Sequence, residues 1–252
     1  MLFPSRKRRI IKNRVFFVYL IGIHLLLGVV LIKSDFIQRV ERKLGSNTTQ
    51  NEITENFSKT LCYHSRMDAN VPNKSVIFIG DSIMRGLAVN AVVCPAVNYG
   101  IENDTTVGIL RRLPIYKSID TASAVVIAIG INDMKYRSNE EILFNLRSIA
   151  DQIPGNVPVI FSAILPRDEE IRDERKGDNQ GRIRDFNSRL ERFTKTSKRL
   201  FFVDAGPLLI DCKGNLADVY HVGDGLHLNS QGNAIWIEQL KEALHNSLKL
   251  QH

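Results

Sequence analysis

Five short apolar runs alternate with segments of helical periodicity from residue 75 onward. Apart from a weak run at 92–99, which Pro95 interrupts, the runs are continuously apolar, which is typical of strands that are buried on both faces of a parallel sheet. The runs cover 75–79, 92–99, 124–129, 157–165 and 200–203, and the helical segments cover 83–91, 106–118, 139–152, 181–197 and 230–248. This alternation predicts an α/β fold with three layers (α/β/α) around a mostly parallel five-stranded sheet. In such sheets, functional residues lie at the carboxyl ends of the strands.

Polar residues suited to nucleophilic chemistry follow several of these runs. The first run leads into Gly-Asp-Ser at 80–82, the second into Asn-Tyr-Gly at 98–100 and the third into Gly-Ile-Asn-Asp at 130–133. A loop before the last helical segment carries Asp224 and His227. Acyl transfer through a serine requires a nucleophile, a base, an orienting carboxylate and donors for an oxyanion. Asp81 and Ser82 are also common helix caps, so the first motif taken alone favours a cap.

Four motifs in this order resemble the SGNH hydrolases, also called the GDSL esterase/lipase family. They are Gly-Asp-Ser-Ile-Met at 80–84, Asn-Tyr-Gly-Ile-Glu-Asn-Asp-Thr-Thr at 98–106, Gly-Ile-Asn-Asp at 130–133 and Asp-Gly-Leu-His-Leu-Asn-Ser-Gln-Gly at 224–232. The resemblance extends from about Ser75 to the C-terminus. Two positions depart from the family pattern, with Ile83 in place of leucine and Asn103 in place of a second glycine. The resemblance implies the flavodoxin-like SGNH fold.

The resemblance also implies a role for each motif residue. Ser82 is expected to be the nucleophile, His227 its general base and Asp224 the carboxylate that orients the imidazole. The expected oxyanion donors are the backbone N–H groups of Ser82 and Gly100 and the side-chain amide of Asn132. No metal and no cofactor are implied.

Three hypotheses about function follow from that resemblance. We expect a serine esterase that hydrolyses or transfers acyl esters, with O-acetyl groups on cell-envelope carbohydrate as the first choice. A lysophospholipase or thioesterase acting on lipid acyl esters is the second. A non-catalytic carbohydrate-binding domain with the same fold is the third.

A second acid-x-x-histidine pair, Asp218 and His221, lies six residues upstream of Asp224 and His227. Asn229 or Ser230, shortly after His227, can cap the last helix, which favours the later pair as the catalytic one. We therefore expect His221 to be a loop residue or a substrate contact.

The amino-terminal residues combine a basic run with a long apolar run. Residues 1–14 hold six Lys and Arg and no acid, and residues 15–32 are apolar apart from Tyr19 and His24. Eighteen helical residues span roughly 27 Å, about the thickness of the bilayer core. We expect a cytoplasmic tail at 1–14, a transmembrane signal anchor at 15–32, a polar stalk at 33–72, and a catalytic domain at 73–252 in the periplasm or outside the cell. A cleaved signal peptide is the alternative.

The positions of the charges and cysteines argue against a nucleic-acid-binding protein and against a zinc finger. The net charge is +7, but residues 47–252 sum to −1, which argues against nucleic-acid binding. The three cysteines are too far apart for a zinc finger. In an oxidising compartment two of them could pair, with Cys62 and Cys94 as the candidate pair and Cys212 left free.

Overall fold

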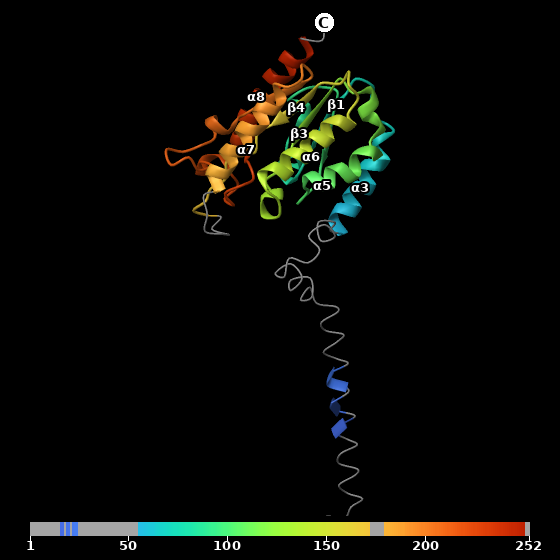
Figure 1. Ribbon diagram of the computed structural model, residues 1–252, viewed down its shortest axis with the longest axis vertical. Coiled ribbons are helices and arrows are strands. Elements are labelled where there is room, and N and C mark those ends of the chain that lie inside the picture. The colour runs from blue at the N-terminus through green and yellow to red at the C-terminus, as the bar shows by residue number, and fades with distance from the viewer. Residues whose placement is uncertain (1–15, 18, 21, 25–54, 172–178, 250–252) are drawn as a thin grey trace, which may run out of the picture. The chain divides into compact units, whose positions relative to one another are not determined.

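The computed structural model describes residues 16, 17, 19, 20, 22–24, 55–171 and 179–249 (Figure 1). The chain divides into two compact units, 1–51 and 52–252. In the first unit the described residues are helical, and the rest of the predicted tail, anchor and stalk up to 54 lies outside the described residues. No helix formed by the described residues is both long enough and apolar enough to cross a bilayer.

The second unit is built on a five-stranded sheet in the order β2-β1-β3-β4-β5. Every neighbouring pair of strands is parallel, which confirms the predicted α/β fold. The strands are β1 (Val76–Gly80), β2 (Ala96–Gly100), β3 (Ala124–Ala128), β4 (Val159–Ser162) and β5 (Leu200–Val203). The chain leaves β1 toward β2 on one side and then returns to β3 on the other. The carboxyl ends of β1 and β3 therefore form a switch point, where ligands bind in sheets of this kind.

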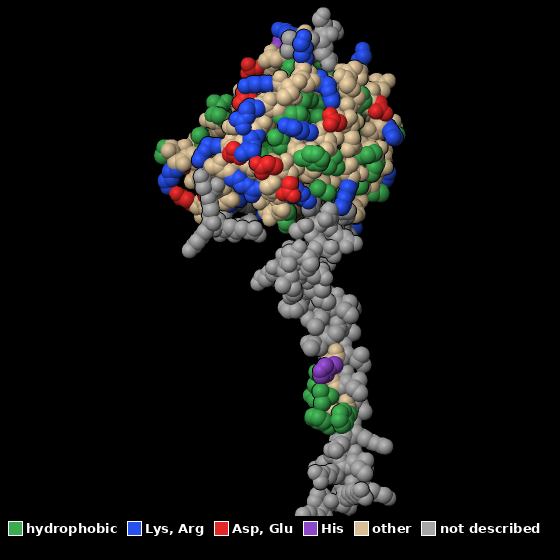
Figure 2. Space-filling model, in the orientation of Figure 1, with side chains coloured by type: hydrophobic (Ala, Val, Ile, Leu, Met, Phe, Trp, Pro, Cys, Tyr) green, Lys and Arg blue, Asp and Glu red, His purple; other side chains and the backbone are tan. Residues whose placement is uncertain are grey.

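Helices cover both faces of the sheet (Figure 1). They are α3 (Glu55–Asp68), α4 (Ser82–Arg85), α5 (Thr106–Arg112), α6 (Asn139–Gln152), α7 (Asn179–Thr194) and α8 (Ser230–Lys249). Alternate strand residues point to opposite faces, so Ile77 packs with α5, α6 and α7, whereas Phe78 packs with α4 and α8. Figure 2 shows Lys and Arg side chains interspersed with Asp and Glu on the face in view, rather than gathered into one basic patch.

The prediction of an irregular stalk is wrong for residues 55–68, which form α3. Its buried residues Phe57, Thr60, His64 and Asp68 recur at helical spacing. Three of these four are polar, so the stripe does not stand out as apolar in the sequence. The Asp68 carboxylate accepts hydrogen bonds from the hydroxyl groups of Tyr99 at 2.8 Å and Ser118 at 2.6 Å. The packed fold therefore includes residues 55–68, which precede the predicted boundary at 73.

Several predicted elements are shorter in the structure. The helix predicted at 83–91 is the four-residue α4, followed by a separate 3-10 turn at Val89–Ala91. The helical region predicted at 106–118, with a break at Pro114, consists of α5 and two 3-10 turns, the first of which contains Pro114. Proline lacks the N–H that an α-helix interior needs, which explains the break. The predicted Cys62–Cys94 pairing is not formed, because Cys62, Cys94 and Cys212 are all free and exposed.

Candidate active site

The turn after β1 fixes the position of Ser82. Gly80 packs so closely under β3 that a Cβ there would lie 2.3 Å from the carbonyl oxygen of Ala128. Asp81 is buried and caps α4, since its Oδ1 accepts a hydrogen bond from the N–H of Ile83 at 2.9 Å. Burial raises the pKa of Asp81 to about 7. The cap is thus Asp81, which leaves the hydroxyl of Ser82 free for another partner.

That partner is His227, which lies 145 residues later in the chain. Ser82 Oγ is 2.8 Å from Nε2 of His227, and Nδ1 of the same ring is 2.5 Å from Oδ2 of Asp224. Asp224 Oδ1 also accepts from the backbone N–H groups of Leu226 at 3.0 Å and His227 at 2.9 Å. Because an ionised carboxylate can only accept, Nδ1 carries the proton and Nε2 is left as the acceptor for the serine hydroxyl. The three residues expected to be catalytic are therefore hydrogen-bonded in series.

Asp224 is held in the ionised form that this arrangement needs. Partial burial acts to raise the pKa of Asp224, but the hydrogen bonds from the His227 ring and from two backbone N–H groups outweigh it. Their combined effect lowers the pKa to about 2. Asp224 is consequently negative at every pH at which an imidazole can act as a base.

The oxyanion role expected of Gly100 stays a prediction, and its donor has a partner within the fold. Its backbone N–H donates to Oδ1 of Asn98 at 2.9 Å, so this donor is already used. A Cβ at Gly100 would lie 2.4 Å from the backbone nitrogen of Arg85. The glycine is thus required for the close contact between β2 and α4. Asn132 is held by a bond from Nδ2 to the carbonyl oxygen of Asp104 at 3.1 Å, and the second amide hydrogen of its NH₂ group remains available.

The backbone of Asn103, in the second motif, is a feature that the sequence reasoning did not consider. It has a φ of +58°, a left-handed conformation that asparagine tolerates better than most residues. Within the part of the chain that the structure describes, its backbone N–H has no acceptor, and the same holds for the N–H of Ser82. The signal was present in the sequence, because Asn103 stands where the family has a second glycine.

Two substitutions separate the roles of Gly100 and Asn103. Gly100→Ala is expected to destabilise the fold by about 1–3 kcal/mol, because the new Cβ overlaps the backbone of Arg85. Asn103→Gly should change stability by no more than about 1 kcal/mol and keep esterase activity, because glycine adopts the same φ. Urea unfolding and steady-state kinetics measure both effects. A Gly100→Ala protein with the stability of the wild type would contradict the packing role.

Solved structures share this fold. A GDSL-like lipase from Bacteroides thetaiotaomicron is 24% identical, with a TM-score of 0.66 over 76% of this chain and 100% of that one. A lipase/acylhydrolase from Enterococcus faecalis is 24% identical, with a TM-score of 0.56 over 67% and 96%. An acetylxylan esterase from Geobacillus stearothermophilus is 18% identical, with a TM-score of 0.55 over 68% and 94%.

A comparison with curated proteins finds no match to the chain. A family model, in contrast, does match it. Residues 78–235 match the model of the GDSL-like Lipase/Acylhydrolase family, and this range includes the serine, the aspartate and the histidine of the hydrogen-bonded series. The matched residues make up more than half of the sequence, so the chain belongs to the GDSL-like lipase/acylhydrolase family.

Proposed function

We propose that this protein is a serine esterase whose substrates are O-acetyl groups on cell-envelope carbohydrate. The observation that carries the proposal is the series of hydrogen bonds from Ser82 through His227 to Asp224. A hydroxyl bonded to an imidazole whose other nitrogen is bonded to a carboxylate is the arrangement of an activated serine nucleophile.

The reaction proceeds in two steps. Ser82 Oγ attacks the ester carbonyl carbon while Nε2 of His227 takes the hydroxyl proton, and Asp224 stabilises the imidazolium that forms. His227 then gives this proton to the departing sugar oxygen, which leaves an acetyl group on Ser82. Water, or an acceptor hydroxyl in a transfer reaction, attacks this acyl-enzyme with the same histidine as base. The products are acetate, or a new ester, and the free serine.

The negative oxygen of each tetrahedral intermediate needs hydrogen-bond donors. We assign this role to the N–H groups of Ser82 and Asn103 and to Nδ2 of Asn132. The residue after Asn103 accepts a bond from Asn132 at 3.1 Å, so two of these donors belong to segments that are bonded to each other. Loss of one such donor typically raises the barrier by about 2.7–4 kcal/mol.

A cavity with several hydrogen-bonding side chains supports a carbohydrate as the alcohol part of the substrate. It has a volume of about 420 Å³, within the range of small-molecule sites, and adjoins α4, the helix that begins at Ser82. Its lining combines polar side chains with apolar surface and includes an exposed aromatic ring, with Asn56, Lys59, Thr60, Tyr63, His64, Met67, Arg85, Asn98 and Gly100. The amide, hydroxyl and charged side chains of this lining can hydrogen-bond to sugar hydroxyls, and the aromatic ring can pack against a sugar ring. The anchor predicted at 15–32 would place this domain on the envelope side of the membrane.

Acetate release tests the proposal. The full-length protein is incubated with acetylated envelope polysaccharide and with the same polysaccharide after alkaline deacetylation, and acetate is measured. We expect the wild type to release acetate from the acetylated polysaccharide and not from the deacetylated one. Ser82→Ala should release no acetate from either. With p-nitrophenyl esters, the acetate should be cleaved faster than the palmitate. Faster cleavage of palmitate would favour a lipid substrate, and no turnover of any ester would favour a binding domain.

A further inference from the structure

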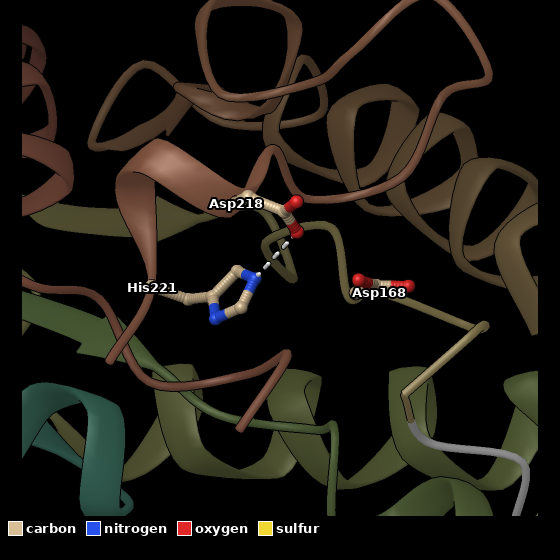
Figure 3. Close-up of side chains that lie close together, drawn as sticks. All are labelled: Asp168, Asp218 and His221. Carbon is tan, nitrogen blue, oxygen red and sulfur yellow. Dashed lines mark hydrogen bonds and ion pairs between the residues drawn. The ribbon is translucent and has the colours of Figure 1, made fainter. Parts of the chain in front are cut away.

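The imidazole of His221 is enclosed by two loops beside the proposed catalytic residues. Figure 3 shows it close to Asp168 and Asp218, and its side chain is only 3% exposed. The mechanism above leaves this ring without a role. Its two nitrogens have opposite surroundings, and these surroundings indicate what the ring does.

Nδ1 of His221 faces two backbone donors. It accepts hydrogen bonds from the N–H groups of Gly223 at 2.9 Å and Gly225 at 3.2 Å. Both glycines have left-handed backbone angles, with φ of +99° and +69°, and these angles allow both amides to turn toward one acceptor. A nitrogen that accepts from two N–H groups cannot carry a proton. Neutral His221 therefore has its proton on Nε2.

Nε2 of His221 faces carboxylates. It lies 3.4 Å from Oδ1 of Asp218, and one oxygen of Asp168 lies within 4.8 Å of both groups. These three side chains could be taken for a metal site. A metal would need the lone pair of Nε2, whereas the glycine amides place the proton on that nitrogen. The carboxylates fit the donor N–H of this tautomer instead.

We infer that His221 is a positioning residue for Asp224, an inference that rests on the proposed esterase function. Gly223 and Gly225 directly flank Asp224, so Nδ1 of His221 accepts from the N–H of the residue on each side of it. The same turn is fixed from outside by the N–H of Asp168, which donates to the carbonyl oxygen of Gly225 at 2.8 Å. The Asp224 side chain is left to face His227.

The contact between Asp224 and His227 depends on this turn. Their side chains meet at 2.5 Å, and the carboxylate also needs its bonds to the N–H groups of Leu226 and His227. If the two glycine amides lose their acceptor, they must find other partners and the turn must rotate. Displacement of a catalytic group by about 1 Å costs about 10²-fold in rate.

Two substitutions distinguish the two ends of the imidazole. His221→Asn keeps an acceptor oxygen near the position of Nδ1, and His221→Gln moves the polar atoms toward the position of Nε2. We expect His221→Gln to lower kcat on p-nitrophenyl acetate by about 10²-fold, with KM nearly unchanged. His221→Asn should restore most of that loss. His245→Gln, on an exposed face of α8, is the matched control and should leave kcat unchanged.

Nitrogen NMR of the ¹⁵N-histidine-labelled full-length protein gives a test that needs no activity. His221 should show a protonated Nε2 and an unprotonated Nδ1. The opposite tautomer, or equal kcat for the Asn and Gln variants, would overturn the inference. If the wild type cleaves no ester, the proposed function fails, and the tautomer still decides whether His221 holds the glycine amides.

Discussion

Ser82→Ala is expected to lower kcat for ester hydrolysis by about 10⁶-fold, and His227→Ala by a similar factor. The two side chains are 2.8 Å apart and act on the same proton, so removing either removes the activated nucleophile. The double variant should therefore be no slower than the single variants. A fluorophosphonate, which phosphonylates activated serines, should label the wild type and leave Ser82→Ala unlabelled.

The histidine in the upstream pair gives the matching control. His221→Ala should keep more activity than His227→Ala, because its ring bonds to glycine amides and Asp218 rather than to Ser82. Unchanged far-UV circular dichroism would show that each variant still folds. If His227→Ala keeps turnover while His221→Ala abolishes it, the role of base belongs to His221. Equal labelling of Ser82→Ala and the wild type would remove Ser82 from the mechanism.

Hydrophobic periodicity and motif order were sufficient to predict the sheet and the central hydrogen bonds. Continuous apolar runs identify buried parallel strands, and each strand delivers its polar residue to the same edge of the sheet. Strand ends alone placed Ser82 and Asn132 at one edge, and the family resemblance assigned His227, on the loop before α8, to the same site. The motif does not distinguish a free N–H from one that is already bonded. The resemblance assigned Gly100 as a donor, and only the structure reveals that its N–H is bonded to Asn98.

Polar residues with a structural role were harder to foresee. In α3 the buried positions include His64 and Asp68, whose hydrogen bonds to other segments appear only after folding. Arg112 follows Arg111 directly, and nothing local distinguishes them. Yet Arg111 is exposed, whereas the side chain of Arg112 is fully buried. Burial of a charge depends on partners that the fold assembles, so neither residue type nor periodicity reveals it.

Arg112→Met is expected to reduce the free energy of unfolding by about 3–5 kcal/mol. The guanidinium donates to Asp104 Oδ2 at 2.8 Å, to the carbonyl oxygens of Tyr99 at 2.8 Å and Gly80 at 3.2 Å, and to the hydroxyl of Tyr116 at 2.8 Å. It thus joins the ends of β1 and β2 to the loop that carries the proposed oxyanion donor. Methionine fills similar volume and leaves the Asp104 carboxylate, which is 1% exposed, without its counter-charge.

The pH dependence of that loss identifies its cause. Burial raises the pKa of Asp104 to about 6, and the Arg112 charge acts against this rise. When the pKa of a carboxyl group is higher in the folded than in the unfolded protein, the free energy of unfolding falls as pH rises. This fall extends from the pKa in the unfolded protein, about 3.9, to the pKa in the folded protein. Without Arg112 the folded pKa moves above 6, so the difference in stability between Arg112→Met and the wild type should grow from pH 6 to pH 8.

Urea unfolding at several pH values measures this difference in stability. Two further variants test whether it comes from the unpaired Asp104 carboxylate. Arg111→Met removes an exposed charge from the same helix and should cost at most about 1 kcal/mol. Adding Asp104→Asn to Arg112→Met removes the unpaired carboxylate, so it should recover part of the stability and abolish the growth of the loss with pH. A loss that stays constant from pH 6 to pH 8 would mean that the neutral partners of Arg112, rather than Asp104, hold the two strand ends and the loop together.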